Sequence, residues 1–462
     1  MPPPLHDERP LWHRVAAAGA LDRRFFLDDR ERITLDAFAR RSALSQREAL
    51  RGASVLLRTQ SQLTTSVGLL ELDGLARRIV LCPPDLDTRY LPAVIADAEA
   101  TAVVSDRPPD DTALTGLRPN MIGAPSEACS RDEEALATEW IMFTSGTTGR
   151  PKMVVHSLRS LTAAITPAAS PPETVWSTFY DIRRYGGLQI LLRALVGGGS
   201  IVLSSAAEPA GAFVERASAA NVSHISGTPS HWRRATLSPS VAGFAPGYVR
   251  MSGEAADQAI IDKLHEVFPG AQVAHAFATT EAGVGFEVGD GSAGFPDTYI
   301  GLRRGVEISV VDGTLRIRSP GNATGYLGAE AGSFFDADGF VDTKDVVERR
   351  GDRYHFVGRR DGVINVGGLK VHPEEVEAVI NRHPSVHLSL VRARRSPIVG
   401  AIVIAEVVLD KAIEERAGSK ALENEILNAC RAVLPLHKVP AAIHFVPALA
   451  LGPAGKLVRA GG

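Results

Sequence analysis

The sequence predicts an α/β fold, in which a large multi-layer amino-terminal domain is joined by a hinge to a small α+β carboxyl-terminal domain. Two observations predict it. Apolar strand-like runs alternate with segments of helical periodicity along most of the chain, which is typical of sheets covered by helices. A glycine-flanked basic segment at residues 358–362 then precedes a tail with strands and helices of its own. A chain of 462 residues with 45% hydrophobic content is long enough to bury more than one core.

The first part of the chain alternates helical and extended patterns. Residues 35–49 and 90–100 have helical periodicity, whereas residues 53–57 and 101–105 have the apolar composition of strands. The same alternation continues over residues 140–360. This order predicts layers of helices and strands in one large domain.

The carboxyl-terminal part begins with two apolar strands on either side of residues 358–362. After them the pattern is strand, helix, strand, strand, helix, strand, with the helices at residues 373–382 and 422–434. We therefore expect a large domain over residues 1–358 and a small domain over residues 359–462.

Charge and composition argue against several classes of protein. The formal net charge is -3, so no overall field favours nucleic acid or an anionic membrane. The amino terminus lacks the pattern of a signal peptide, and no apolar run approaches the length of a membrane span. Cys82, Cys129 and Cys430 are too far apart for a metal site or a disulfide framework. We expect a cytoplasmic protein with reduced, structural cysteines and without a nucleic-acid or membrane partner.

Residues 141–152 have the composition of a phosphate-binding loop. Hydroxyl groups and glycine N–H groups can donate to phosphate oxygens, and a lysine adds positive charge. The segment supplies Thr144, Ser145, Gly146, Thr147, Thr148, Gly149 and Lys152. Its spacing differs from that of the nucleotide-binding P-loop, which has four residues between its glycines and a hydroxyl residue after the lysine. The other alternative is a turn rich in glycine and threonine, and the Arg-Pro-Lys that follows argues against it.

This loop resembles that of the adenylate-forming superfamily of acyl-CoA synthetases, peptide-synthetase adenylation domains and luciferases. Phe143 and Met153 replace a tyrosine and a glycine of the family's loop. The family's other motifs follow in order within residues 140–462. The resemblance implies a large ATP- and acid-binding domain followed by a small mobile domain. Because the family's amino-terminal portion is usually longer, we expect that part of this chain to be shortened.

A second motif contains Phe277, Ala278, Thr280 and Glu281 and is similar to the family's aromatic-Gly-x-Thr-Glu, with alanine in place of glycine. The resemblance implies that Thr280 contacts phosphate and that Glu281 holds Mg²⁺, a metal that prefers oxygen ligands. A helix cap is the structural alternative for such a Thr-Thr-Glu sequence.

Two further motifs resemble the family's nucleoside contacts. Gly253 and Glu254 match the turn beside the adenine, although Ser-Gly-Glu is also a common turn. Asp345 matches the aspartate that accepts both ribose hydroxyls, and Arg359 matches the second residue on the ribose side. Lys344 stands where the family has a glycine, which leaves the local backbone geometry open but keeps the carboxylate.

The carboxyl-terminal motifs imply motion and thioester chemistry. Asp361 matches the family's hinge residue, and a hinge needs a few residues that absorb a large dihedral change. Gly367, Gly368 and Lys370 match the segment that lines the pantetheine tunnel after the small domain has turned. Lys456 matches the lysine that bridges the substrate carboxylate and the α-phosphate, where one cation neutralises two anions.

The acid-binding segment is the least typical of the family. It includes Tyr180, Asp181 and Tyr185, and Gly227 is expected to supply another wall. Many family members have a histidine in this region, and peptide-synthetase modules place an aspartate that pairs with an α-amino group. For Asp181 a polar pocket and an exposed loop both stay open.

Together the motifs predict ATP- and Mg²⁺-dependent activation of a carboxylic acid to an acyl-adenylate, followed by thioester formation with coenzyme A. The alternative within the same superfamily is a stand-alone adenylation enzyme that loads the acid onto a carrier protein. A third possibility, an inactive nucleotide-binding regulator, would be expected to lack Lys456 or Glu281, and both are present.

Overall fold

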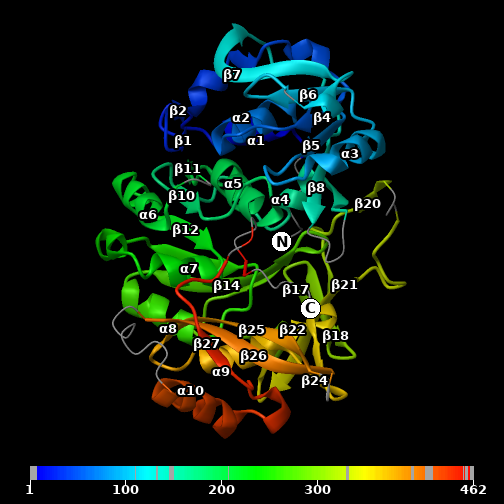
Figure 1. The fold of residues 1–462 in the computed structure, drawn as a ribbon. Helices are drawn as coiled ribbons and strands as arrows, with labels where there is room; N and C mark the ends of the chain where they lie inside the picture. Colours follow the sequence, from blue (N-terminus) through cyan, green and yellow to red (C-terminus); the bar gives the residue numbers. More distant parts are fainter. Residues whose placement is uncertain are drawn as a thin grey trace.

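The computed structural model describes residues 8–109, 111–131, 134–144, 150–205, 208–328, 332–396, 400–410, 420–450, 452 and 456–457. Figure 1 shows three regions stacked along the molecule, with the amino-terminal layers at the top and the carboxyl-terminal elements at the bottom. A second layered region lies between them. The structure thus has the α/β layers that the sequence predicts.

The first large sheet has eight strands with a parallel centre. In order they are β20 (Gly325–Leu327), β9 (Lys152–Ser157), β8 (Glu139–Thr144), β5 (Arg78–Leu81), β4 (Ser54–Leu57), β6 (Ala102–Ser105), β7 (Arg118–Ala128) and β3 (Arg41–Leu44). Strands β4, β5, β6 and β8 pair in parallel, whereas β8 and β9 form an antiparallel pair. Helix α3 (Leu91–Ala98) packs on one face of this sheet.

The second large sheet also has eight strands. In order they are β15 (Gly283–Val288), β14 (Gln272–Thr279), β13 (Tyr248–Ser252), β12 (His224–Gly227), β10 (Val175–Thr178), β11 (Ser200–Leu203), β1 (Phe25–Leu27) and β2 (Arg32–Thr34). The strands from β14 to β1 in this order are parallel, and β15 and β2 close the two edges in antiparallel pairing. Their side chains alternate between the two faces, so each face receives its own layer of helices.

The main core lies between the two sheets. It contains the apolar side chains of α1 (Leu11–Ala17), α2 (Gln62–Leu72), α4 (Leu158–Thr162) and α5 (Tyr185–Gly197). A second core lies on the other face of the second sheet, under α6 (Ala210–Ala219), α7 (Pro229–Ala235) and α8 (Gln258–Val267). Helix α5 therefore faces the second sheet from the inside of the molecule (Figure 1).

A third sheet continues from the second and carries the chain toward the carboxyl-terminal elements. It contains β16 (Phe295–Pro296), β22 (Arg353–Arg359), β21 (Val341–Arg350), β19 (Thr314–Arg318), β18 (Val306–Val311) and β17 (Gly301–Arg303). A short 3-10 turn at Arg360–Gly362 follows β22. Asp361, the predicted hinge residue, lies in this turn.

The elements after this turn share one core of their own. They are the hairpin of β23 (Ile364–Val366) and β24 (Leu369–Val371), helices α9 (Pro373–Ile380) and α10 (Lys420–Val433), and the sheet of β25 (Val386–Ser396), β26 (Gly400–Leu409) and β27 (Ile443–Phe445). The two predicted helices and the alternation of strands agree with this structure.

The expected helix at residues 35–49 is wrong. The structure has a 3-10 turn at Leu35–Phe38, then β3, then a second 3-10 turn at Arg47–Leu50. Strand β3 pairs with β7, and the buried carboxylate of Glu71 accepts hydrogen bonds from the Ser42 hydroxyl and the Ala43 N–H. These long-range contacts override the local helical periodicity.

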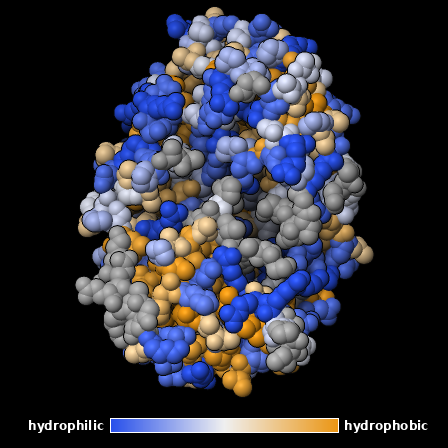
Figure 2. Space-filling model, viewed as in Figure 1, coloured by the Kyte–Doolittle hydropathy of each residue, from blue (hydrophilic) through white to orange (hydrophobic). Residues whose placement is uncertain are grey.

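No described helix has both the length and the apolar composition needed to cross a membrane. The visible face of the molecule carries hydrophilic residues over most of its upper half, and apolar residues gather in the lower half (Figure 2).

Candidate functional site

The candidate residues gather at the carboxyl ends of the parallel strands of the second sheet. Gly227 ends β12, Gly253 and Glu254 follow β13, and Thr280 follows β14. In open α/β sheets this edge is where ligands bind, because the loops there are free to vary while the strands hold them in place. Residues that lie far apart in the sequence are thereby brought to one edge.

Lys456 lies at this edge. Gly253 has a φ of +85°, and a side chain there would place its Cβ 3.4 Å from Cε of Lys456. The carboxylate of Glu254 accepts the N–H of Ser230 at 3.0 Å through one oxygen and the N–H of Leu457 at 3.1 Å through the other. Glu254 thus ties the carboxyl-terminal segment to the start of α7, and this bond positions the neighbouring Lys456.

The ammonium of Lys456 sits among charged groups while the residue stays exposed. Protein atoms crowd it from several sides, and this partial burial lowers its pKa, whereas Glu254 and Asp345 act to raise it. Arg359 and Arg184 add to the lowering. A cation in this open position can be reached by a ligand while its carboxylate neighbours hold it in place.

Asp345 and Arg359 are direct cross-strand partners of β21 and β22. Their side chains form a loose ion pair at 3.8 Å, and Arg359 lies 3.7 Å from Asp361. Burial raises the pKa of Asp345 to about 6, against the opposing effect of Arg359 and Lys456. Lys344, which precedes Asp345, has a φ of +62°, so it takes the left-handed conformation that a glycine adopts most easily.

The predicted phosphate loop joins β8 to β9. Ser145, Gly146, Thr147, Thr148 and Gly149 lie outside the described residues. Thr144 and Lys152 are cross-strand partners at the base of this loop.

Lys152 connects the phosphate loop to the predicted metal ligand. Its ammonium lies 5.1 Å from the ring centre of Tyr326, and the hydroxyl of Tyr326 donates to Glu281 at 3.1 Å. The described residues contain no cluster of three or more metal-ligating side chains.

Phe277 and Ala278 support the loop from the end of β14. The Phe277 ring stacks on those of Phe286 and Phe356. Opposite Phe277 and Ala278 the register shifts by one residue, because β15 carries the extra residue Gly285, so the bulge bends the strand that follows Thr280 and Glu281.

His156 is a residue near the site that the sequence reasoning missed. It is buried on β9, its Nε2 contacts the carbonyl oxygen of Thr280 at 2.7 Å, and its Nδ1 contacts the Ser160 hydroxyl at 2.9 Å. Because a carbonyl can only accept, Nε2 carries the proton. Burial lowers the pKa of His156 to about 4, so the ring is neutral at pH 7. The only signal in the sequence is a histidine four residues after Lys152, which is not enough to predict this contact.

Tyr180 and Tyr185 are buried on the inner side of the site. Tyr180 donates to the carbonyl of Ser252 at 2.6 Å, and the Tyr185 ring lies 5.6 Å from that of His156. Gly227 is closely packed, since a Cβ there would lie 2.8 Å from the Phe179 ring. These three residues line the region between α5 and the ends of β12 and β13.

Asp181 is neither in an exposed loop nor unpaired. Both of its carboxylate oxygens accept from Arg183, at 2.8 and 2.6 Å, and Arg183 also donates to the carbonyl of Thr59 at 2.7 Å. The neighbouring Arg184 pairs with Asp85. These charges satisfy one another, so they hold the loop before α5 in place.

The residues predicted to contact coenzyme A lie in the β23–β24 hairpin. Gly367 and Gly368 form its turn with φ values of +57° and +90°, and the Gly368 N–H donates to the side chain of Asn365 at 2.8 Å. Lys370 is exposed on β24. The hairpin packs through Ile364 and Val371 on the core of the elements after the 3-10 turn.

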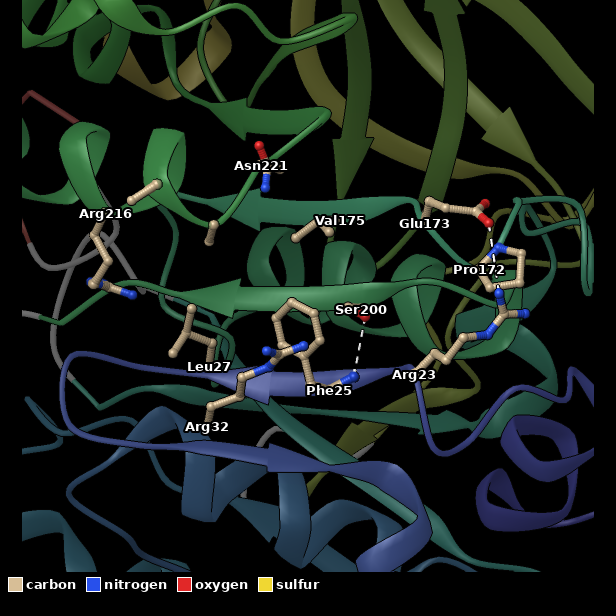
Figure 3. Close-up of a pocket in the computed structure, with 12 residues that line it drawn as sticks. Arg23, Phe25, Leu27, Arg32, Pro172, Glu173, Val175, Ser200, Arg216 and Asn221 are labelled. Carbon is tan, nitrogen blue, oxygen red and sulfur yellow. Dashed lines mark hydrogen bonds and ion pairs between the residues drawn. The ribbon is translucent and has the colours of Figure 1, made fainter.

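A separate hollow of about 590 Å³ lies at the other end of the strands of the second sheet, where their amino ends are (Figure 3). It is lined by residues near the amino ends of β10 and β11, such as Val175 and Ser200. Arg23 and Glu173 form an ion pair across it at 3.8 Å, and Arg32 stacks on the ring of Phe25. None of the candidate residues lines this hollow, and it lies away from the strand ends where they converge.

Comparison with known proteins agrees with this geometry. The family model of the AMP-binding enzymes matches residues 51–328, and that of the AMP-binding enzyme C-terminal domain matches residues 375–456. The chain belongs to the AMP-binding enzymes of the adenylate-forming superfamily. Membership supports a ligase that uses ATP to activate an acid by adenylation.

Individual relatives differ in what they are named for. Feruloyl-CoA synthase of an Amycolatopsis species is 28% identical, over 69% of this chain and 68% of that protein. Surfactin synthase subunit 1 of Bacillus subtilis (strain 168) is 24% identical, over 88% of this chain and 12% of that protein. The crystal structure of the anthranilate CoA ligase AuaEII with anthranoyl-AMP has a TM-score of 0.80 at 17% identity and covers 97% of this chain and 95% of its own. That structure shares the fold.

Proposed function

We propose that this protein converts a carboxylic acid and ATP into an acyl-adenylate and pyrophosphate, and then transfers the acyl group to the thiol of coenzyme A. The observation that carries this proposal is the position of Lys456, which lies against Gly253 and whose charge interacts with the carboxylates of Glu254 and Asp345. In the first step the acid's carboxylate oxygen attacks the α-phosphorus and pyrophosphate leaves. Both reacting groups are anionic, so a cation held between them lowers the barrier.

The other candidate residues have distinct roles in this proposal. Asp345 and Arg359 bind the ribose, Gly253 lets the adenine approach the backbone, and Thr144, Lys152 and Thr280 bind phosphate oxygens together with the residues of 145–149. Glu281 would hold Mg²⁺, whose charge neutralises the phosphates. His156 fixes the carbonyl of Thr280 and thereby the loop that presents Glu281.

The second step needs a different arrangement of the chain. We propose that residues 359–462 form a small domain that turns about Asp361 and brings Gly367, Gly368 and Lys370 to the site. The thiol then attacks the acyl carbonyl, AMP leaves with the bonding electron pair, and the thiol proton passes to solvent. The acceptor approaches only after pyrophosphate has left, so one site serves both steps.

Transfer to a carrier protein is the second candidate. The match to surfactin synthase over 88% of this chain favours it. Arg394 and Arg395 are exposed on β25, while Arg392 pairs with Glu406 at 3.1 Å, and exposed arginines can bind either the phosphates of coenzyme A or an acidic carrier. These arginines do not favour one acceptor, and we place coenzyme A first because the feruloyl-CoA synthase match spans most of both chains.

The test is pyrophosphate release with a panel of aryl, short-chain, medium-chain and amino acids, with and without coenzyme A. We expect at least one acid to release pyrophosphate and to form a thioester when coenzyme A is present. A thioester formed only with a carrier protein would replace coenzyme A by the second candidate. ATP binding without turnover of any acid would contradict the proposed adenylation activity and favour an inactive nucleotide-binding regulator.

Lys456→Ala separates the two steps. We expect pyrophosphate exchange to fall about 10²- to 10³-fold, because the cation acts only where carboxylate and α-phosphate meet. Thioester formation from supplied acyl-adenylate should stay within a few-fold of wild type. Lys263→Ala is the matched control, since Lys263 is exposed on α8 and pairs with Glu266. Exchange by Lys456→Ala at the wild-type rate would remove Lys456 from the site.

A further inference from the structure

The inner face of the second sheet carries a line of polar side chains that the proposed reaction does not use. Ser226 on β12, Arg250 and Ser252 on β13 and Glu287 on β15 belong to it. Cross-strand pairing places Ser226 beside Arg250, and it places Ser252 beside Ala276 and Ala276 beside Glu287. Residues two apart on a strand share a face, so Arg250 and Ser252 face α5 together.

Arg193 approaches the same place from α5, and Arg250 is close enough for its charge to affect it. Arg250 is 2% exposed and donates to Glu287 at 3.0 Å, and Tyr248 also hydrogen bonds to Glu287. Two guanidinium groups therefore share one carboxylate. The cluster of Arg193, Tyr248, Arg250 and Glu287 keeps an excess positive charge inside the protein, which is costly without an anionic partner.

Several donors in this cluster and on the neighbouring Ser226 have no hydrogen-bond partner in the described part of the chain. They include Nη2 of Arg250, Nε of Arg193 and the hydroxyl of Ser226, all of them buried atoms. Burial and the neighbouring Arg250 both lower the pKa of Arg193. Buried donors without a partner are uncommon in folded proteins, and each costs free energy until something accepts its proton.

The cluster lies directly behind the reaction centre. Gly253 lies against Lys456, and Ser252 is the residue before Gly253. Arg250 lies two residues before Ser252 and on the same face of β13, which is about 7 Å along the strand. On the opposite wall, Arg193 follows Tyr185 by eight residues, or about 12 Å along α5. An acid whose carboxylate lies beside Lys456 would thus extend toward the two arginines.

Small residues leave room for such an acid. The face of β14 that is turned toward α5 carries Ala276 and Ala278, and Ala278 is only partly buried although it packs against the central core. Arg193 and Glu287 are also partly exposed despite their place among protein atoms. The cluster is therefore not sealed from solvent.

We propose that the acid activated by this protein carries a second anionic group, which Arg193 and Arg250 bind at the far end of the acyl site. This inference rests on the proposed adenylation of an acid at Lys456. Arg250 is held by Glu287 and forms the fixed half of the site, and Arg193 supplies the second guanidinium. A purely aliphatic monoacid leaves Nη2 of Arg250 and Nε of Arg193 without an acceptor.

The experiment compares pairs of acids that differ only in the distal group. Adipate is compared with hexanoate, and terephthalate with 4-methylbenzoate, by kcat/KM for pyrophosphate release. We expect the better diacid to exceed its monoacid by roughly 10²-fold or more, because a site built around charged donors rejects an analogue that lacks the acceptor. Arg193→Met should abolish this preference by raising KM for the diacid, while monoacid turnover stays within a few-fold.

Arg193→Lys and Arg216→Met are the controls. Lysine keeps the charge and should restore part of the diacid preference, and Arg216 lies on α6, where it pairs with Glu208 away from the site. Thermal unfolding checks that each variant is folded. If Arg193→Met does not fold, Arg193→Lys becomes the test. Compared with wild type it should raise KM for the diacid, by less than a full loss of the charge would, and leave monoacid kinetics unchanged.

The outcomes separate the two proposals. Pyrophosphate release from monoacids as efficient as from diacids, or an unchanged preference in the folded Arg193 variants, overturns the second anionic group and leaves the proposed function intact. Release from no acid of either kind overturns the proposed function and this inference with it.

Discussion

Lys344 shows how one residue departs from the family pattern while the local backbone keeps the shape a glycine would take. Its φ of +62° places it in the left-handed region, which costs a residue with a Cβ about 1 kcal/mol or more. The side chain is exposed, and the Lys344 N–H donates to Asp342 at 2.9 Å. The bend carries Asp345 into the site without a glycine.

Lys344→Gly is therefore expected to raise the free energy of unfolding by about 0.5 to 1 kcal/mol, after the larger entropy of the unfolded glycine is counted. Lys344→Ala keeps the Cβ and should give no such gain. Chemical denaturation measures both. Equal stability of the glycine and alanine variants would show that the backbone at this position is not strained.

Asp345 couples nucleotide binding to pH. Its pKa of about 6 lies above the ordinary value of 3.8 because it is buried, and the protonated form can no longer accept from both ribose hydroxyls. We expect kcat/KM for ATP to fall below about pH 6, approaching tenfold per pH unit. Asp345→Asn should be less active and should lose this pH dependence.

The same shift predicts the opposite trend in stability. Because the folded pKa is raised, protonation of Asp345 favours the fold, and its contribution is complete below pH 3.8 and lost as the pH rises through about 6. The buried histidines change stability in the other direction, so the comparison is the difference between wild type and Asp345→Asn. Relative to wild type, the free energy of unfolding of Asp345→Asn should increase between pH 4 and pH 7. A difference that is constant across this range would contradict the raised pKa.

At the scale of elements, the start of α5 determines how the loop with Tyr180 and Asp181 meets the site. A Cβ on Gly187 would lie 2.3 Å from the carbonyl oxygen of Asp181, whereas a Cβ on Gly186 would meet only the Tyr180 ring at 3.7 Å. The loop backbone therefore passes directly over Gly187. Any side chain at that position must displace either the loop or the helix.

Gly187→Ala should lower the free energy of unfolding by about 2 kcal/mol or more, since a clash with backbone is harder to relieve than one with a side chain. Gly186→Ala, one residue earlier in the same helix, should be neutral or stabilising by up to about 1 kcal/mol, because alanine favours the helix. Urea titration of the two variants checks this. Equal destabilisation would show that the loop does not rest on Gly187.

The elements also show where sequence patterns suffice. Helices α3, α9 and α10 and strands β4 and β6 agree with the local periodicity, because each has one consistent apolar face. The segment of residues 35–49 has a helical pattern, yet it pairs with β7, a strand far from it in the sequence. The periodicity within a segment carries no information on a strand that pairs with it from so far away in the sequence.

For the whole molecule, polar contacts join α7 and α8 to the elements after the 3-10 turn. Arg233 donates to both oxygens of Asp257 at 2.7 and 2.6 Å, and Asn381 donates to Asp257 at 3.1 Å. Arg233 also donates to the carbonyl of His387 at 3.3 Å. These contacts, with Glu254 and Leu457, hold Lys456 at the site in the arrangement that the first step needs.

Asp361→Pro tests the proposed rotation. Position 361 lies in the 3-10 turn at Arg360–Gly362. Residues of 3-10 turns commonly have a φ of about -50 to -70°, which a proline also adopts. The present arrangement should therefore survive, and with it pyrophosphate exchange. Thioester formation should fall at least about tenfold, because a fixed φ hinders the change of conformation. Asp361→Ala is the control that removes the side chain and leaves the backbone free. Equal loss of both steps in a folded Asp361→Pro variant would place the pivot elsewhere.

The sequence by itself determined the α/β class, the membership of the adenylate-forming superfamily and the order of the motifs, because these follow from periodicity and from short segments with their own chemistry. The tertiary structure alone brought Lys456 beside Gly253 and Glu254, buried His156 against Thr280, and joined Arg183 to the carbonyl of Thr59. It also gathered Arg193, Arg250 and Glu287 behind the site. No local pattern marks such groups, because each joins residues from different elements, and their charges and burial exist only once the sheets and helices have packed.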